Sequence, residues 1–247
     1  MGVPKCIVWD IDATMVHTHD KDYENNMSIQ DKFSMLDIFS DEEKFKLRKK
    51  LYTMKIIDVV EPGKGRITFL TGIFRPHLET MIDYMKINNF SFVIWSAGTP
   101  KYVHKMAEIM FPEKDFQPEI IYTLDDCEIE KDKNGDITTV IKPLEKLFKD
   151  KRLKGKLTEK NTIVIDDRED TFSKNPKNGI QIPEFESDLT VEDVCDHSDV
   201  NLLKLMAWLQ TKEVRECTDV RKLKKNKIFQ KDLEEYIEQL KNENKDE

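Results

Sequence analysis

The sequence lacks the long hydrophobic runs that mark membrane proteins. Across its 247 residues, no apolar stretch approaches the roughly 18–20 residues that a helix needs to cross a bilayer. A strand-like stretch follows almost directly after the first methionine, so we expect no targeting peptide ahead of it. These absences predict a soluble, intracellular protein that does not interact with a membrane.

Cysteine is scarce and scattered along the chain. The four cysteines are Cys6, Cys127, Cys195 and Cys217, and no two of them form a C-x-x-C pair. This pattern argues against a disulfide-stapled scaffold and against a structural zinc site. Free thiols are typical of a reducing compartment, so we expect a cytoplasmic or nuclear protein.

Positive charge is in deficit, with 40 Lys and Arg against 48 Asp and Glu and a net charge of −8. Nucleic acid binding driven by bulk charge is therefore not expected. The run "RKLKKNK" at 221–227 is locally basic, and we interpret it as a solvated helix end or loop. Hydrophobic residues make up 38% of the chain, which suffices for a substantial core.

Strand-like and helix-like patterns alternate along the sequence. Apolar, strand-like runs occupy 6–10, 66–70, 90–96, 119–124, 161–167 and 178–182. A capping box formed by Ser40 and Glu43 predicts a helix over 41–54. Further helices are expected after Arg75-Pro76, after Thr99-Pro100, from Leu144 and over 199–210. Asn134-Gly135 predicts a β-hairpin over 127–141.

Strands that are apolar on both faces and alternate with helices indicate an α/β fold. We expect a doubly wound, mostly parallel, Rossmann-like sheet with helices on both faces. Residues 1–212 would form its core, in which 18–68 is an insert or a small cap. Residues 213–247 would form a helical extension, whose apolar stripe at 229, 233, 236 and 240 predicts a docking helix.

Polar residues follow several of the buried strands. Asp10 and Asp12, Ser96, Lys142, and the pair Asp166 and Asp167 all stand at or just after strand ends. In doubly wound sheets, ligand sites lie beyond the carboxyl ends of the strands, so these residues should converge on one crevice. Four carboxylates together would repel one another, and Mg²⁺ is the expected remedy because it prefers hard oxygen ligands.

Structural interpretations of the same residues remain open. They are a capped loop for Asp10 and Asp12, a loop cap for Ser96, a solvated strand end for Lys142, a surface ion pair with Arg168 for Asp166 and Asp167, and a helix start for Arg75. The histidines show no metal-ligand spacing, and Trp9 and Trp95 are interpreted as core residues.

In this order, the motifs resemble the haloacid-dehalogenase-like phosphohydrolases. The resemblance narrows to the RNA polymerase II carboxy-terminal-domain (CTD) phosphatases and the related NLI-interacting-factor-like small phosphatases. The matching segments are "WDIDATMVH", "FRPHLETMIDYM", "VIWSAGTPKYVHKMAEIMFP", "IKPLEKL", "IVIDDREDTFSKNPKNGIQI" and "DVNLLKLMAWL". Together they cover about residues 5–17 and 69–210, and leave the insert and the tail outside.

The resemblance implies roles for individual residues. Asp10 would be the nucleophile that forms an aspartyl-phosphate, and Asp12 the general acid and base. The metal site would comprise Asp10, Asp12 (through its backbone carbonyl), Asp166 and Asp167, with Mg²⁺ as the cofactor. Ser96 and Lys142 would be catalytic and would also bind the substrate phosphoryl group. Thr14, Ala97 and Arg75 complete the expected substrate-binding set.

The resemblance also implies a function. We expect a phosphoserine/threonine protein phosphatase whose partner is a phosphoprotein or phosphopeptide, with the insert or the C-terminal helix as a possible protein-binding surface. The alternatives are a nucleotide or nucleic-acid-end phosphatase on the same scaffold and a non-catalytic binding scaffold. Two departures from the family pattern are Ala13, where a polar residue is usual, and Ser96, where threonine is commoner. No breast-cancer-type C-terminal repeat is recognisable after residue 212.

Overall fold

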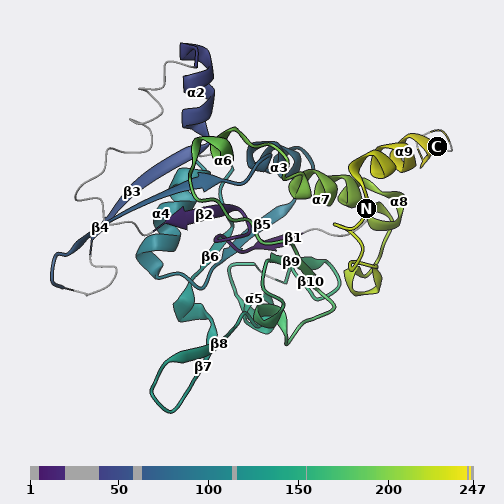
Figure 1. Ribbon diagram of the computed structural model, residues 1–247. Coiled ribbons are helices and arrows are strands. Elements are labelled where there is room, and N and C mark those ends of the chain that lie inside the picture. The colour runs from purple at the N-terminus through teal and green to yellow at the C-terminus, as the bar shows by residue number, and fades with distance from the viewer. Residues whose placement is uncertain are drawn as a thin grey trace.

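A parallel sheet lies at the centre of the computed structural model, which describes residues 6–19, 39–57, 63–112, 116–153, 155–243 and 245 (Figure 1). Five strands pair in the order β10-β9-β1-β5-β6, all parallel. Their bounds are β1 Cys6–Trp9, β5 Ser91–Trp95, β6 Ile120–Tyr122, β9 Thr162–Asp166 and β10 Gly179–Gln181. Each strand lies inside a run for which the sequence predicted a strand.

The central strands are apolar throughout because both faces of the sheet are covered. In β1, Ile7 and Trp9 pack into one hydrophobic core, whereas Cys6 and Val8 pack into the other. Helices α3 (Leu78–Ile87), α4 (Pro100–Met110) and α7 (Asn201–Gln210) cover the first face, and α5 (Leu144–Lys149) covers the second. This arrangement confirms the expected doubly wound fold with helices on both faces.

A second, antiparallel sheet adjoins the first motif. Strands β2 (Val16–His19), β4 (Ile67–Phe74) and β3 (Leu51–Ile57) pair in the order β2-β4-β3. β4 is longer than the strand expected at 66–70. Part of the expected insert, including residues 20–38 and 58–62, lies outside the described residues.

The predicted helix over 41–54 is too long. The capping box of Ser40 and Glu43 is present, but helix α2 ends at Lys49 and strand β3 begins at Leu51. In β3, Leu51 is buried, and from Tyr52 onward buried and exposed residues alternate, with Tyr52, Met54 and Ile56 buried. An alternation of every second residue is the period of a strand. Leu51 and Met54 also fit helical spacing, and pairing with β4 decides between the two patterns.

Helix starts were predicted with mixed success. α4 begins at Pro100 after Thr99, as expected, but the Thr99 side chain makes no capping bond and its Oγ1 is buried without a partner. Helix α3 begins at Leu78, and its N-cap is His77 in a left-handed conformation rather than Arg75. Arg75 is therefore the last residue before this turn and is available for tertiary contacts.

The hairpin and the C-terminal segments complete the fold. β7 (Glu128–Lys131) and β8 (Ile137–Ile141) form the predicted hairpin, which projects from the molecule in Figure 1. The short helices are α6 (Val191–Cys195) and α8 (Lys212–Arg215), and the 3-10 helices are η2 (Leu124–Asp126), η3 (Glu169–Phe172) and η4 (Val220–Lys222). Helix α9 (Leu233–Glu243) lies against α7, with Tyr236 buried in the first core.

Two further expectations concern the chain as a whole. None of the four cysteines is bonded to another in a disulfide. Within the described residues, no helix combines the length and the apolar character that a bilayer crossing requires.

Candidate active site

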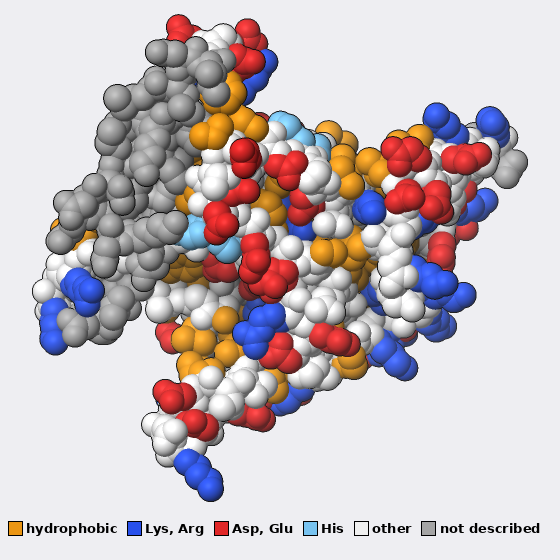
Figure 2. Space-filling view, in the orientation of Figure 1, with side chains coloured by type: hydrophobic (Ala, Val, Ile, Leu, Met, Phe, Trp, Pro, Cys, Tyr) orange, Lys and Arg blue, Asp and Glu red, His pale blue; other side chains and the backbone are white. Residues whose placement is uncertain are grey.

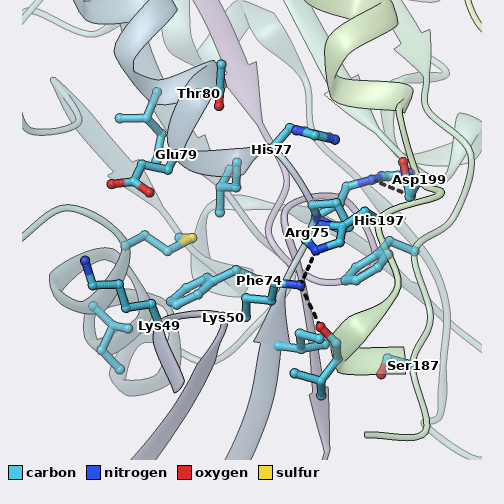
Figure 3. Close-up of a pocket in the computed structure, with 18 of the residues that line it drawn as sticks. Lys49, Lys50, Phe74, Arg75, His77, Glu79, Thr80, Ser187, His197 and Asp199 are labelled. Carbon is cyan, nitrogen blue, oxygen red and sulfur yellow. Dashed lines mark hydrogen bonds and ion pairs between the residues drawn. The ribbon is translucent and has the colours of Figure 1, made fainter. Parts of the chain in front are cut away.

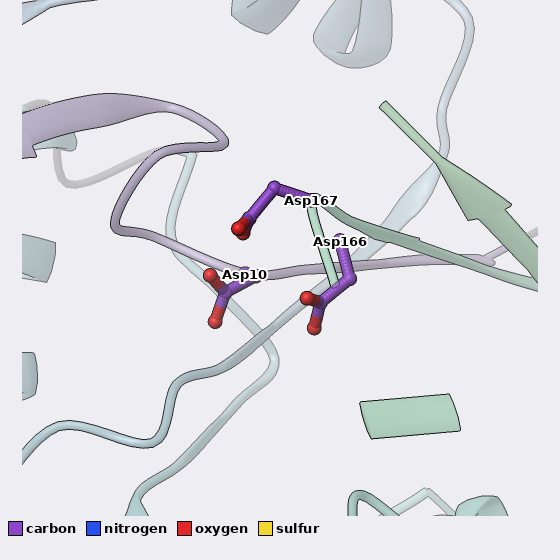
Figure 4. Close-up of side chains that lie close together, drawn as sticks. All are labelled: Asp10, Asp166 and Asp167. Atoms are coloured by element: carbon purple, nitrogen blue, oxygen red, sulfur yellow. The ribbon is translucent and has the colours of Figure 1, made fainter. Parts of the chain in front are cut away.

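Three carboxylates meet at the carboxyl ends of β1 and β9, the two neighbouring strands at the centre of the sheet. Asp10 follows β1 directly, Asp166 is the last residue of β9, and Asp167 follows it. One carboxylate oxygen from each lies within 4.8 Å of the others (Figure 4). The backbone N–H of Asp10 donates to the carbonyl of Ile165 at 3.0 Å, which fixes the two strand ends side by side.

Lys142 joins two of these carboxylates. Its Nζ lies 2.5 Å from Oδ1 of Asp10 and 2.6 Å from Oδ2 of Asp166, and its side chain is 2% exposed. Burial opposes the charge on Lys142, but the two neighbouring carboxylates outweigh this effect and raise the pKa of its ammonium group. Lys142 is therefore a buried cation, and its interpretation as a solvated strand end is wrong.

The carboxylates are unevenly compensated. Burial raises the pKa of Asp10, which Lys142 partly offsets and Asp166 reinforces. Burial and the charge of Asp166 likewise raise the pKa of Asp167. One lysine thus faces three crowded acids, and a divalent cation would balance the remaining charge. The hard oxygen donors of Asp10, Asp166 and Asp167 fit Mg²⁺ in this respect.

Thr14 holds Asp167 in place. The Thr14 hydroxyl donates to Oδ1 of Asp167 at 3.2 Å, and the backbone N–H of Asp167 donates back to the same hydroxyl at 3.0 Å. Thr14 is fully buried. These contacts connect the first motif to Asp167 and agree with the orienting role that the resemblance implies for the Thr14 hydroxyl, whereas its contact with a substrate stays a prediction.

Ser96 and Ala97 lie at the end of β5, next to β1. Ser96 is 2% exposed, and its hydroxyl accepts a hydrogen bond of 3.1 Å from the N–H of Gly98. Its own N–H donates to the carbonyl of Tyr122 on β6. Ser96 thus makes the loop-capping contact that remained open from the sequence, and Ala97 beside it is half-buried. Their contacts with a substrate phosphoryl group stay a prediction.

The Arg75 side chain makes its hydrogen bonds within the protein. Its Nε donates to Asp199 at 3.0 Å, one terminal nitrogen donates to the Thr14 carbonyl at 3.0 Å, and the other donates to the Pro183 carbonyl at 2.7 Å. Arg75 is 1% exposed to solvent. Each of its nitrogens thus has a protein acceptor, and its contact with a substrate stays a prediction.

Asp12 lies apart from the three-carboxylate group and is surrounded by hydroxyl groups. Thr18 donates to its Oδ1 at 2.9 Å, and Tyr102 donates to the same oxygen. Burial raises the pKa of Asp12, and the hydrogen bonds from Tyr102 and Thr18 offset part of this rise. The Asp12 side chain is thus not part of the three-carboxylate group, and its role in proton transfer and that of its backbone carbonyl in metal binding stay predictions.

Sequence reasoning missed Thr18, Tyr52 and Tyr102. Tyr102 stood inside one of the matched motifs but received no role, and Thr18 and Tyr52 belong to the segment interpreted as an insert. Cross-strand pairing brings Thr18 and Tyr52 together, so no local pattern in the sequence could have identified them.

A pocket of about 730 Å³ lies elsewhere, between the end of β4, helix α3 and the segment around α6 (Figure 3). None of the three clustered carboxylates lines it, and neither do Asp12 and Lys142. Figure 3 shows Lys50 pointing toward His197, and the Lys50 Nζ also donates to the Val194 carbonyl at 2.6 Å. This pocket is therefore distinct from the carboxylate cluster.

Comparison with solved structures supports the fold. A structure described as fission yeast RNA polymerase II CTD phosphatase Fcp1-R271A bound to beryllium fluoride matches with a TM-score of 0.50 and 19% identity, covering 73% of this chain. A structure of Fcp1, described as an essential RNA polymerase II CTD phosphatase, matches with a TM-score of 0.51 and 16% identity, covering 97% of this chain. The chain spans 42% and 64% of these two proteins, respectively.

Comparison with protein families is more specific. No curated protein sequence matches the chain significantly. The family model described as NLI interacting factor-like phosphatase matches residues 5–221, which include every residue of the carboxylate cluster and Lys142. The chain therefore belongs to the NLI interacting factor-like phosphatase family, in agreement with the motifs of its sequence.

Proposed function

We propose that the protein is a Mg²⁺-dependent phosphomonoester hydrolase that works through an aspartyl-phosphate on Asp10, and that its substrates are phosphoserine/threonine proteins. The observation that carries this proposal is the buried contact of Lys142 with Asp10 and Asp166, beside Asp167, at the carboxyl ends of the central strands. Family membership supports the same chemistry.

The first step is phosphoryl transfer to Asp10. Lys142 holds Oδ1 of Asp10, and no described residue hydrogen-bonds its Oδ2, which is left to attack phosphorus. As the new bond from Oδ2 to phosphorus forms, the bond from phosphorus to the leaving oxygen breaks. Asp12 gives its proton to that oxygen, so that the leaving group departs as a neutral alcohol.

The second step regenerates the enzyme. The Asp12 carboxylate takes a proton from water as the water oxygen attacks the phosphorus of the aspartyl-phosphate. The bond from phosphorus to Asp10 breaks, which releases inorganic phosphate and restores the Asp10 carboxylate. Lys142 lies 2.5 Å from Asp10 and balances its negative charge before and after each step.

Asp10, Asp167 and the backbone carbonyl of Asp12 would hold Mg²⁺, with Asp166 beside them. When bound, the ion supplies positive charge for the phosphoryl oxygens and fixes their orientation. Thr14 serves this site indirectly, since its hydroxyl orients Asp167.

The phosphoprotein substrate is argued from the family and from the two structural relatives, whose descriptions name an RNA polymerase II CTD phosphatase. The nucleic-acid-end alternative relies on the basic run at 221–227. In the structure, however, Arg221 pairs with Asp219 and Glu159, and Lys225 donates to three backbone carbonyls. Figure 2 shows acidic side chains over the middle of the visible face, and Lys and Arg side chains gathered mainly along its right-hand edge with acidic ones among them. The cytoplasmic or nuclear location stays part of the proposal.

The test measures hydrolysis of p-nitrophenyl phosphate by the purified protein with Mg²⁺ and after chelation. We expect turnover with Mg²⁺, its loss on chelation and its loss in Asp10→Asn. The matched control is Asp83→Asn, an exposed carboxylate on α3, which should retain wild-type activity. An active Asp10→Asn variant would reject the mechanism.

Substrate class is tested separately, by comparing kcat/KM on phosphoserine peptides, nucleoside monophosphates and 3′-phosphorylated oligonucleotides. We expect the peptides to be preferred. A preference for either nucleotide substrate would overturn the protein-phosphatase assignment but leave the hydrolase assignment intact.

A further inference from the structure

One oxygen of the Asp12 carboxylate carries all of its hydrogen bonds. Thr18 on β2 donates to Oδ1 at 2.9 Å, and Tyr102 on α4 donates to the same atom. The two hydroxyl oxygens lie 2.7 Å from each other. In the described part of the chain, no residue hydrogen-bonds the other oxygen, Oδ2. Oδ1 of Asp12 is therefore held by two hydroxyl donors, whereas Oδ2 has no hydrogen-bond partner among the described residues.

Thr18 is itself supported from across the antiparallel sheet. The register places Thr18 of β2 opposite Gly72 of β4, and Gly72 opposite Tyr52 of β3. The Tyr52 hydroxyl nevertheless lies 2.7 Å from Oγ1 of Thr18, two strands away. Because Thr18 donates its one hydroxyl proton to Oδ1 of Asp12, the Tyr52 hydroxyl is the donor in the contact with Thr18, and it also lies 3.4 Å from the His17 carbonyl oxygen as a second acceptor.

Gly72 makes this reach possible. A Cβ atom at position 72 would lie 2.3 Å from the Tyr52 hydroxyl oxygen and 2.3 Å from the backbone carbonyl oxygen of His17. Any side chain there would occupy the path of the tyrosine over the middle strand. The absence of a side chain at Gly72 thus allows Tyr52 of β3 to reach Thr18 of β2, which in turn donates to Asp12 of the first motif.

We propose that Tyr102 and the row formed by Tyr52, Gly72 and Thr18 are positioning residues that hold Oδ1 of Asp12 and reserve Oδ2 for proton transfer. This inference rests on the proposed function, because it concerns the acid and base of that reaction. The antiparallel sheet β2-β4-β3 thereby takes part in the site: β2 carries Thr18, β3 carries Tyr52, and Gly72 on β4 leaves the space between them (Figure 1).

Leaving-group dependence tests this role. A leaving group that forms a stable anion, as in p-nitrophenyl phosphate, needs little help from an acid, whereas an alkyl or phosphoserine leaving oxygen must be protonated. We compare kcat/KM on both substrates, since this ratio covers the steps up to departure of the leaving group. Tyr102→Phe should lose ~10–100-fold on the phosphoserine peptide and no more than a few-fold on p-nitrophenyl phosphate.

Further variants separate positioning from folding. Thr18→Val should show the same selective loss as Tyr102→Phe, Thr18→Ser should restore the wild-type ratio, and Tyr52→Phe should show a smaller loss. The matched control is Tyr236→Phe on α9, which removes a buried tyrosine hydroxyl that donates to the Ile228 carbonyl. The control should leave the ratio between the two substrates unchanged.

The outcomes are distinguishable. An equal loss on both substrates in Tyr102→Phe and Thr18→Val, or no loss on either, overturns the positioning role while the proposed function stands. A wild-type protein without Mg²⁺-dependent turnover of p-nitrophenyl phosphate overturns the proposed function itself. Thermal unfolding of each variant establishes that the compared proteins are folded.

Discussion

Ala13 directly follows Asp12 in the first motif and has a φ angle of +56°, in the left-handed region that favours glycine. Its N–H donates to the Val16 carbonyl at 2.8 Å, and its carbonyl accepts from the Phe185 N–H at 2.8 Å. These two bonds impose the conformation, because they turn the chain back sharply after Asp12. The departure from the family pattern at this position therefore carries a conformational strain of about 1–2 kcal/mol.

Replacing Ala13 with glycine should relieve this strain. Glycine also gains freedom in the unfolded chain, so we expect Ala13→Gly to raise the free energy of unfolding by about 0.5–1 kcal/mol. Ala13→Val should lower it by more than that, because a β-branched residue fits this region poorly. Urea denaturation of the three proteins measures both changes, and a stabilised Ala13→Val would contradict the assignment of strain.

Replacing Lys142 should lower the stability of the fold most strongly in the absence of metal. Lys142→Met would leave Asp10 and Asp166 buried, close together and without their cation. We expect the free energy of unfolding to fall by about 3–5 kcal/mol in metal-free buffer, with part of it regained on addition of Mg²⁺.

The control for this change is Lys146→Met, which removes a half-exposed lysine whose Nζ lies 2.8 Å from Asp126. It should change stability by less than about 1 kcal/mol. Equal effects of the two variants, measured by denaturation with and without Mg²⁺, would show that Lys142 does not hold the cluster.

At the scale of elements, the site depends on how closely neighbouring strands and turns approach. Strand β10 extends the sheet beside β9, and the turn η3 lies over its start, where Phe172 packs in the second core. A Cβ atom at Gly179, the first residue of β10, would lie 2.1 Å from the Phe172 ring. The approach of η3 therefore requires glycine, and η3 also carries Thr171, whose carbonyl accepts from the Lys142 N–H at 2.6 Å.

Gly179→Ala should displace Phe172 and lower the free energy of unfolding by about 1–3 kcal/mol, as overpacking does in other cores. Adding Phe172→Leu should restore part of this loss, since the smaller side chain makes room for the new methyl group. The pair is measured as a double-mutant cycle by chemical denaturation. Strictly additive effects would contradict the contact between the two residues.

At the scale of the whole molecule, the C-terminal segment is packed against the phosphatase core. Helix α9 contacts α7, with Tyr236 buried and Leu233 and Leu240 packed around it. The family match ends at residue 221, before α9 begins at Leu233. In Figure 1, α9 lies beyond α7, on the far side from the hairpin β7-β8. We expect helix α9 to stabilise the fold without contributing to catalysis.

Tyr236→Ala should lower the free energy of unfolding by about 3–5 kcal/mol, because it removes a buried aromatic ring. The unfolding transition should stay monophasic, and kcat on p-nitrophenyl phosphate should stay at the wild-type level below that transition. An early separate transition would indicate instead that residues 213–247 fold as an independent unit.

The sequence by itself determined the class of the fold and the acidic residues that cluster at the strand ends. The strands are apolar on both faces, and Asp10, Asp166 and Asp167 stand directly at strand ends, so local pattern and strand direction were enough to predict that they meet. Lys142 was placed correctly in the same series, although its buried contact with two carboxylates could not be read from its own surroundings.

Tertiary structure decided what depends on pairing between distant segments. Residues 51–54 fit a helix as well as a strand, and only β4 beside them made them a strand. The surroundings of Arg75 come from distant segments, because the carbonyls of Thr14 and Pro183 and the carboxylate of Asp199 meet its guanidinium group only in the folded chain. The hydroxyl groups around Asp12 come from three separate elements, and a hydrogen bond between side chains that far apart in sequence exists only once the chain has folded.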